Sequence, residues 1–345
     1  MTRCVKIPLA EAQKVKRCLL DKNYINHEYR ALKEGDFIYF PIIDSFCCEE
    51  KCNYELVEKD LLKSIKAELT ARPFKEVLSE ILSSKEMEIA KTAYDQLGGI
   101  AIIEIQDELL GKEKEIAQAL INSNPSVKTV LRKDGIHDGV FRAQKMKFLA
   151  GEETRVAEYR ENNCTIKVDV EEVYFSARLS TERKRISALV QEGEDILVMF
   201  SGAAPYPCVL SKNTDAKEII SVEINPAGHE YGLKNIAKNK CKNVELFCGD
   251  VREIIPTLNK TFDRIIMPLP KTAEEFLDIA LPVAKKNAII HLYAFYHEDE
   301  FDKAKKEIDK YCKKFNREYK ILDIVKCGQH APRTYRICVD FKLLN

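Results

Sequence analysis

The sequence of 345 residues predicts an α/β protein in which a Rossmann-like, doubly wound domain follows two smaller α+β domains. From about residue 165 onwards, short apolar strands alternate with helical segments, which is typical of a parallel sheet with helices on both faces. Before that point strand and helix patterns are mixed, and glycines interrupt them. With 45% hydrophobic residues, the chain can fill several buried cores. We place the domain boundaries at 1–62, 63–165 and 166–345.

The elements expected in the two smaller domains follow from local periodicity. The Lys/Glu-rich segment 61–92 has helical spacing. The pair Gly98–Gly99 indicates a turn that enters a buried strand. The remaining expected elements are a helix over 8–20, a strand over 36–42, a helix over 111–123 and a strand over 127–131.

The last domain is predicted to contain five parallel strands and a terminal hairpin. Each strand is a short apolar run, and each of the first four is preceded by a helical stretch. The strands are expected at 195–200, 219–224, 244–250, 262–268 and 287–293, the helices at 180–191 and 226–238, and the hairpin at 319–325 and 335–341.

Charge and cysteine content limit the class of protein. Lys and Arg together number 55, as do Asp and Glu, so the chain does not coat polyanions over its whole surface. The N-terminus lacks a signal-peptide core and no apolar run is long enough to span a membrane. We therefore interpret the 12 cysteines as reduced thiols of a cytoplasmic protein. Cys47, Cys48 and Cys52 are close together, but a zinc site would need a second pair nearby, so we expect no metal.

Four segments fall where the parallel strands end, which is where doubly wound sheets bind ligands. Phe200 and Gly202 follow the first strand, and a glycine there lets the backbone approach a ligand closely. Glu223 ends the second strand and is suited to accept hydrogen bonds from ribose hydroxyls. Asp250 ends the third strand and is suited to accept from an adenine amino group. The other candidate cofactor residues are Ile224, Val251, Pro268 and Pro270.

This pattern favours S-adenosylmethionine as the cofactor. Ribose and adenine recognition without a phosphate-binding loop fits that molecule, whereas NAD would require a glycine fingerprint that the sequence lacks. Taken singly, each segment also fits an ordinary turn or a solvated strand-end acid, and it is their occurrence at successive strand ends that favours a site.

Several strings match a known family. They include Gly139 to Arg142, Val173 to Leu179, the run from Asp195 to Pro207, the turn Gly249 to Arg252 and the segment Ala331 to Arg333. On these residues the chain resembles the archaeal and eukaryotic tRNA (guanine-37-N1)-methyltransferases over essentially its whole length. The strings from Ala204 to Pro207 and from Phe295 to Glu298 resemble the archaeal branch associated with wyosine nucleosides, some of whose members also methylate C7 of 4-demethylwyosine.

The resemblance implies a class I methyltransferase domain and roles for particular residues. Glu182 is the implied general base that takes the N1 proton, and Arg142 the implied partner of guanine O6. Read without the family, Glu182 is an acid in the first turn of a charged helix, where the helix dipole favours it. Arg183 is implied to contact the cofactor. Further substrate contacts are implied for Arg142, Tyr174, Arg178 and Lys271.

The family also implies tRNA as partner, contacted at its elbow by the N-terminal domain and at its anticodon loop by the catalytic domain. We expect a monomer. A candidate phosphate-contacting face, which could equally be an ordinary solvated surface, consists of Arg132, Lys133, Arg142, Lys145, Lys147 and Arg183 to Arg185.

One departure from the family concerns the end of the fourth strand. Many members carry Asn there, but this chain has Pro268, which has no backbone N–H and no polar side chain. This favours the wyosine-associated branch. Methylation of C7 of 4-demethylwyosine alone and a non-catalytic tRNA-binding module remain the alternatives. A cytosine-C5 methyltransferase would need a thiol near Pro268 to Lys271, where there is none.

Overall fold

The structure is a computed structural model that describes residues 2–22, 24–26, 28–46, 54–61, 72–135, 144–269 and 271–345. The chain forms two compact units, one of residues 1–77 with 122–125 and one of 78–121 with 126–345. Cys47, Cys48 and Cys52 lie outside the described residues, so the structure does not test the metal expectation there.

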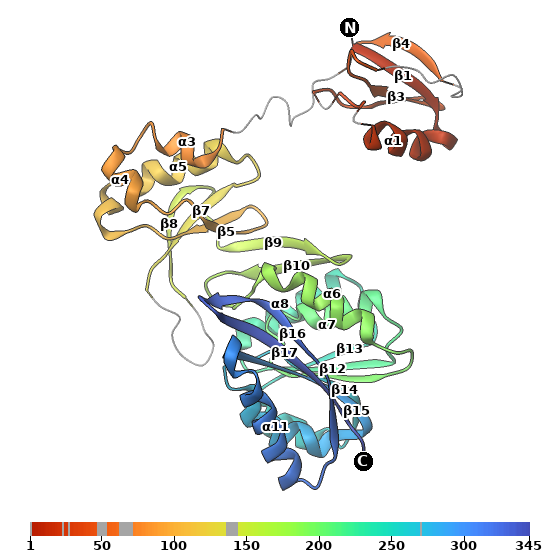
Figure 1. The fold of residues 1–345 in the computed structure, drawn as a ribbon, viewed down its shortest axis with the longest axis vertical. Helices are drawn as coiled ribbons and strands as arrows, with labels where there is room; N and C mark the ends of the chain where they lie inside the picture. The colour runs from red at the N-terminus through yellow and green to blue at the C-terminus, as the bar shows by residue number, and fades with distance from the viewer. Residues whose placement is uncertain are drawn as a thin grey trace. The chain divides into compact units, whose positions relative to one another are not determined.

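The first unit is built on a four-stranded antiparallel sheet with the strand order β2-β3-β1-β4 (Figure 1). An amphipathic helix packs on it through Leu19, against Val5, Ile7 and Phe40. The elements are β1 (Thr2–Pro8), α1 (Ala12–Asp21), β2 (Leu32–Glu34), β3 (Phe37–Pro41) and β4 (Glu55–Lys59), and the unit ends within α3 (Phe74–Leu78).

The second unit begins with a four-stranded sheet of order β5-β6-β7-β8, in which β6 and β7 run parallel. Gly98 makes the turn between the first two strands with a φ of +56°, and a Cβ atom there would lie 2.1 Å from the carbonyl oxygen of Glu158. The elements are α4 (Ser84–Ile89), β5 (Tyr94–Leu97), β6 (Ile100–Ile103), α5 (Glu113–Ser123), β7 (Thr129–Lys133) and β8 (Met146–Gly151).

A hairpin of β9 (Val156–Glu161) and β10 (Cys164–Asp169) fastens this part to the large sheet domain. The side chain of Asn235 in α8 (Pro226–Lys238) accepts from and donates to the backbone of Lys167, with both hydrogen bonds 2.8 Å long. Asn239, the C-cap of the same helix, makes the same pair of 2.8 Å hydrogen bonds with the backbone of Thr165. Residue 165 lies inside β10. We retain the boundaries 1–62, 63–165 and 166–345 as a proposal, and note that the hairpin packs on the large domain as a whole.

The large domain is a seven-stranded sheet of order β13-β12-β11-β14-β15-β17-β16. The first five strands of that order are parallel, and the last two form an antiparallel hairpin. The order reverses between β11 and β14, which is the switch point where such sheets bind ligands. The strands are β11 (Asp195–Val198), β12 (Glu218–Glu223), β13 (Val244–Cys248), β14 (Phe262–Met267), β15 (Ala284–His297), β16 (Tyr319–Ala331) and β17 (Thr334–Leu343).

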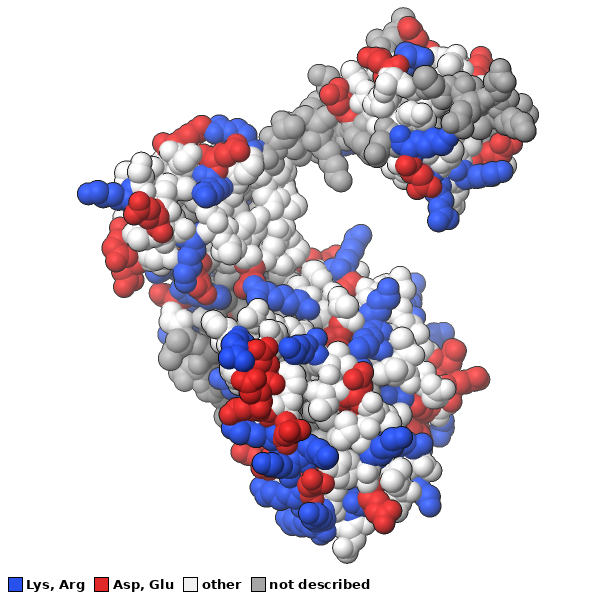
Figure 2. All heavy atoms as spheres, in the orientation of Figure 1, with Lys and Arg blue, Asp and Glu red and all other residues white. Residues whose placement is uncertain are grey.

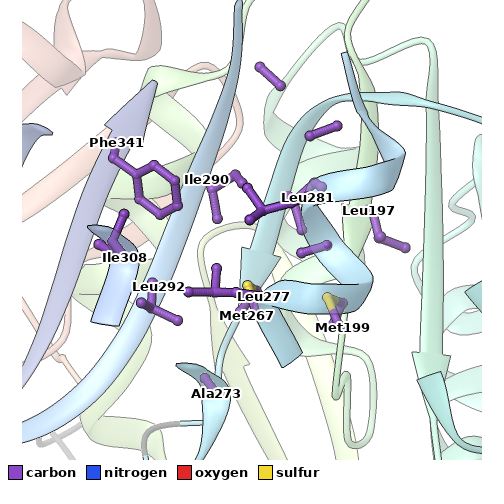
Figure 3. Close-up of a cluster of buried hydrophobic side chains, with 14 of the residues drawn as sticks. Leu197, Met199, Met267, Ala273, Leu277, Leu281, Ile290, Leu292, Ile308 and Phe341 are labelled. Carbon is purple, nitrogen blue, oxygen red and sulfur yellow. The ribbon is translucent and has the colours of Figure 1, made fainter. Parts of the chain in front are cut away.

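Helices cover both faces of this sheet (Figure 1). The larger core lies on the face of α9 to α11 and contains Leu277, Ile308 and Phe341 (Figure 3). The smaller core lies on the opposite face and contains Ile186 of α6 and Leu210 of α7. The helices are α6 (Ser180–Leu189), α7 (Pro205–Asn213), α9 (Val251–Thr257), α10 (Leu277–Ala280) and α11 (Asp302–Lys314).

The predicted α/β architecture with a Rossmann-like domain is confirmed. The five parallel strands and the terminal hairpin are present, and the hairpin strands are longer than expected. α11 was not predicted, although its buried Ala304, Ile308 and Cys312 have helical spacing. Among the described residues, no helix is long and apolar enough to cross a membrane.

Candidate cofactor and RNA site

A pocket lies at the carboxyl ends of the parallel strands, on both sides of the switch point between β11 and β14. It is closed on one side by the segment that precedes α6. Its lining includes Val173, Tyr174, Phe175, Ser176, Leu179, Arg183, Phe200, Ser201, Gly202, Pro205, Tyr206, Glu223, Ile224, Asn225, Gly249, Asp250, Val251, Arg252, Pro268, Leu269 and Phe276.

The loop after β11 is held in a strained conformation. Phe200, Gly202 and Ala204 have φ angles of 58°, 55° and 59°, in the left-handed region. For a residue with a Cβ atom this costs on the order of 1–3 kcal/mol, and such residues concentrate at functional sites. Phe200 and Gly202 were both predicted as cofactor residues, Gly202 because a glycine lets the backbone approach a ligand closely. The left-handed conformation of Phe200 and Ala204 could not be inferred from side-chain type.

Glu223 lies at the tip of β12 and is only 8% exposed. Its two carboxylate oxygens each accept one backbone N–H, from Gly202 at 2.5 Å and from Asn225 at 2.8 Å. Burial raises the pKa of Glu223, and these two amide bonds offset part of the rise. Each oxygen keeps a lone pair for another donor, so the carboxylate is suited to bind two adjacent hydroxyls of a ribose.

Asp250 lies at the tip of β13, where it caps α9 by accepting the N–H of Arg252 at 2.8 Å. Arg252 stacks on Phe276 with 3.9 Å between its guanidinium carbon and the ring centre. Phe276 in turn contacts Phe200 edge to face, at 4.8 Å between ring centres. An acid beside two aromatic rings provides both an acceptor and apolar walls for a purine.

Arg183 lines the pocket, but its charge is fully paired. It is 2% exposed, and its guanidinium donates two hydrogen bonds of 2.5 and 2.6 Å to Glu161 and a third to the carbonyl of Ser176. The sequence predicted a cofactor contact here. The structure adds that Arg183 fixes the backbone of the segment that closes the pocket.

Glu182 does not line the pocket, because α6 turns it inward. The carboxylate is 4% exposed, accepts two hydrogen bonds from Arg185 at 2.7 and 2.8 Å, and accepts the Tyr293 hydroxyl at 2.6 Å. Burial alone would raise the pKa of Glu182, but these bonds outweigh it and lower the pKa below its usual value. The hydroxyl of Tyr206, a pocket-lining residue, lies 2.8 Å from that of Tyr293 and connects Glu182 to the pocket wall.

A buried polar network continues inward from Glu182. Arg185 also donates to Asp340 at 2.6 Å, and Asp340 is 2.6 Å from Nδ1 of His291. The other ring nitrogen of His291 is 2.7 Å from a guanidinium nitrogen of Arg264. Because an arginine only donates, Nε2 must accept and Nδ1 carries the proton. His291, Cys338 and Asp340 are close enough to share a metal ion, but the contact of His291 with Arg264 opposes a cation there.

The structure separates the predicted substrate residues. Tyr174 is 39% exposed and lines the pocket, as does Pro268. The side chain of Arg178 is 76% exposed and forms an ion pair with Asp95, and Arg178 is not among the lining residues. Lys271 is exposed and also lies outside the lining. Arg142 and Pro270 lie outside the described residues.

The candidate phosphate-contacting face is not a free basic surface. Within the described residues, Arg132, Lys133 and Lys147 form ion pairs with acids of their own domain, and Arg183 and Arg185 are paired inside the protein. Figure 2 shows the same intermixing of basic and acidic side chains over the visible face. Lys145, Lys147 and Lys184 are the exposed members of the set among the described residues, and Lys147 is one of those in ion pairs.

Twelve of the lining residues were not among the predicted site residues, and Leu179, Tyr206, Asn225 and Phe276 are four of them. Asn225 carried a usable signal, because Asn before Pro226 is a typical helix N-cap directly after a strand-end acid. The other three enter the pocket from helices and turns whose positions depend on the tertiary path of the chain.

A doubly wound sheet with acids at the tips of its second and third strands, and without a phosphate-binding loop, defines a nucleoside-cofactor domain of the methyltransferase type. Residues 157–322 match the TRM5/TYW2 methyltransferase domain, 74–154 the TYW2 N-terminal domain and 4–47 the tRNA methyltransferase 5 N-terminal domain.

Known proteins resemble the chain over most or nearly all of its length. The tRNA (guanine(37)-N(1))-methyltransferase Trm5b of Pyrococcus abyssi is 35% identical over 99% of both chains. The tRNA (guanine(37)-N(1))/4-demethylwyosine(37)-methyltransferase Taw22 of Nanoarchaeum equitans is 34% identical over 73% of this chain and all of its own. The structure of Methanocaldococcus jannaschii Trm5 in complex with adenosine superposes with a TM-score of 0.67, at 30% identity and 99% coverage of both chains. The chain belongs to the Trm5/TYW2 methyltransferase family.

Proposed function

We propose that the protein transfers a methyl group from S-adenosylmethionine to N1 of guanine 37 in tRNA. The observation that carries this proposal is the pocket at the switch point, where Glu223 and Asp250 face a nucleoside-sized space in a chain that matches Trm5b from end to end. The predicted cofactor, S-adenosylmethionine, contains an adenosine group, and a solved relative has been crystallised with adenosine.

The residues around the pocket fit the adenosine part of this cofactor. Glu223 accepts from the ribose hydroxyls, and Asp250 accepts from the adenine amino group while the N–H of Val251 donates to the ring. Phe200, Ile224 and Phe276 supply apolar walls. Gly202 lets the backbone come close, and Pro268 borders the end of the pocket at β14. When bound, the cofactor supplies a methyl group on a positively charged sulfur.

The chemistry at guanine requires removal of the N1 proton and stabilisation of charge on O6. We assign removal of the N1 proton to Glu182 and stabilisation of the charge on O6 to Arg142. The lowered pKa of Glu182 keeps it ionised, and a weakly basic carboxylate suffices because N1–H becomes strongly acidic as the methyl group bonds to N1. Asp340 holds Arg185 as well, so Glu182 can turn toward the substrate without leaving that guanidinium unpaired. Tyr174 lies at the mouth of the pocket, where its ring can stack on the target base. Arg178 and Lys271 are exposed cations that can contact the RNA phosphates.

Methylation of C7 of 4-demethylwyosine is a second candidate activity, and Pro268 favours it. Proline at this pocket position offers no amide to orient the Watson–Crick edge of guanine. No amide at this position therefore restricts the base to the orientation that presents N1. The likeness to Taw22, named for both activities, is consistent with a bifunctional enzyme.

A nucleoside assay separates these activities. The protein is incubated with S-adenosylmethionine and either an unmodified tRNA transcript or tRNA carrying 4-demethylwyosine, and the digested nucleosides are analysed by mass spectrometry. We expect N1-methylguanosine from the first substrate and a C7-methylated tricycle from the second. A transcript with adenine at position 37 is the control. Binding of tRNA without any methyl gain would identify a non-catalytic tRNA-binding module.

Asp250→Ala is expected to weaken S-adenosylmethionine binding by roughly 10-fold, the equivalent of one hydrogen bond to a charged group. The measurement is isothermal titration calorimetry, with Cys248→Ala as a nearby exposed control. Because Asp250 also caps α9, the melting temperature is measured in parallel. Unchanged affinity in a folded variant would remove Asp250 from the cofactor site.

The remaining partner assignments belong to the same proposal. We infer that the unit containing β1 to β4 contacts the tRNA elbow, since its residues 4–47 match the Trm5 N-terminal domain, and that the pocket receives the anticodon loop. We also propose that the protein is a monomer. The described cysteines are free thiols, which suits a protein of the reducing cytoplasm.

A further inference from the structure

One face of the β15–β17 pair carries a row of side chains that leads from the buried network to the edge of the sheet. His291 lies opposite Asp340, Tyr293 opposite Cys338 and Phe295 opposite Arg336. Alternate residues of a strand share a face, so these three pairs follow one another on the side of α6. The first two pairs are enclosed, whereas the third lies where the parallel strands end, at the same edge as the pocket.

The third pair forms an aromatic and cationic surface with His330 of β16. The rings of Phe295 and His330 stack at 4.2 Å between centres with 27° between their planes. The guanidinium carbon of Arg336 lies 5.2 Å from the centre of the Phe295 ring. His330 is exposed, and Phe295 and Arg336 are half-buried. We call these three residues the edge platform.

The edge platform adjoins the pocket through Tyr174. A terminal nitrogen of Arg336 donates to the Tyr174 hydroxyl at 3.1 Å, and Tyr174 lines the pocket. On the inner side, Phe295 follows Tyr293, whose hydroxyl binds Glu182. The platform therefore lies beside both the pocket mouth and the assigned base.

Arg336 differs from the other arginines in this part of the domain. Arg183, Arg185, Arg264 and Arg333 all pair with carboxylates. Within the described ranges, Arg336 forms no ion pair, and its Nε is buried without an acceptor. An uncompensated planar cation beside two stacked rings attracts an anionic, planar ligand rather than a peptide or a metal ion.

We propose that the edge platform stacks a nucleobase of the anticodon loop next to the methylated purine. This inference rests on the proposed function, because the occupant is the single-stranded RNA that enters the pocket. Proteins hold splayed-out bases of such loops on aromatic side chains and arginine planes. Of the bases in the loop, only the target purine enters the pocket beside the cofactor. The platform is thus a second base-binding position, and it holds the strand while the target purine is turned into the pocket.

The test is a double-mutant cycle that combines protein variants with tRNA variants, and the measured quantity is the affinity for tRNA. The dissociation constant is measured for wild type and Phe295→Leu with an intact transcript and with transcripts that lack the base on one or the other side of position 37. Loss of one stacked base weakens binding by roughly 5- to 150-fold. We expect that loss for wild type at one of the two positions, and little further loss for Phe295→Leu with the same abasic transcript.

Further variants separate stacking from folding. His330→Ala changes an exposed side chain, and Arg336→Lys keeps the charge but removes the stacking plane, so both are expected to weaken tRNA binding with S-adenosylmethionine affinity unchanged. Phe301→Leu is the matched control, because Phe301 packs on the other face of the sheet. If the losses from Phe295→Leu and from the missing base are additive at both abasic positions, the proposal of a base-stacking platform is wrong. Absence of methyl transfer by wild type would overturn the proposed function, while the binding cycle would remain readable.

Discussion

Replacing Glu182 with glutamine is expected to lower the rate of methyl transfer to guanine N1 by roughly 10²- to 10⁴-fold, the usual cost of a lost general base. Glutamine has the same shape and can still accept from Tyr293, but it cannot take a proton. Arg185 keeps Asp340 as its charged partner, so the fold is expected to persist. The measurement is single-turnover transfer of a labelled methyl group to a tRNA transcript.

Affinity for S-adenosylmethionine distinguishes catalysis from structure in this variant. Glu182 does not line the pocket, so calorimetric affinity should change little. Tyr293→Phe is the matched control, because it removes one hydrogen bond from Glu182 while leaving the carboxylate in place. A parallel loss of cofactor binding and melting temperature in Glu182→Gln would assign Glu182 to the structure instead.

Glu161→Gln is expected to lower the free energy of unfolding of the large domain by about 3–5 kcal/mol. Both partners of the Arg183–Glu161 pair are 2% exposed in their side chains, so the substitution leaves a buried guanidinium without its counterion. The measurement is urea-induced unfolding followed by circular dichroism.

Two further variants check the cause of this loss. The double variant Glu161→Gln with Arg183→Met is expected to recover part of the stability, because no unpaired charge stays buried. Lys234→Ala breaks a pair whose side chains are 54% and 66% exposed, and should cost below about 1 kcal/mol. Equal losses from the buried and the exposed pair would contradict the explanation.

The sequence was informative wherever a local pattern determines the structure. α8 begins at Pro226 and ends at Lys238 as predicted, because Asn225 caps it and proline suits its first turn. Glu223 and Asp250 were predicted at the pocket because the ends of parallel strands meet at one edge, and both line it.

The sequence was less informative where distant segments meet. Arg178 pairs with Asp95, which lies 83 residues earlier, and no local pattern encodes such a partner. The inward direction of Glu182 depends on how α6 packs against β15 and β17, so a charged first turn gave no sign of its burial. The edge platform joins residues of three strands and could likewise not be predicted. Phe295 and His297 were singled out only because their string resembles the wyosine-associated branch.

The left-handed residues after β11 have a consequence for selectivity among nucleotides. A turn that is already forced into an unfavourable geometry by the packing around it has no lower-energy alternative shape nearby. We therefore expect this wall of the pocket to be formed before any ligand arrives, so that entry of the methyl donor requires little ordering of the chain. The turn also lacks the glycine fingerprint whose backbone N–H groups hold a pyrophosphate, and this argues against a dinucleotide as the ligand.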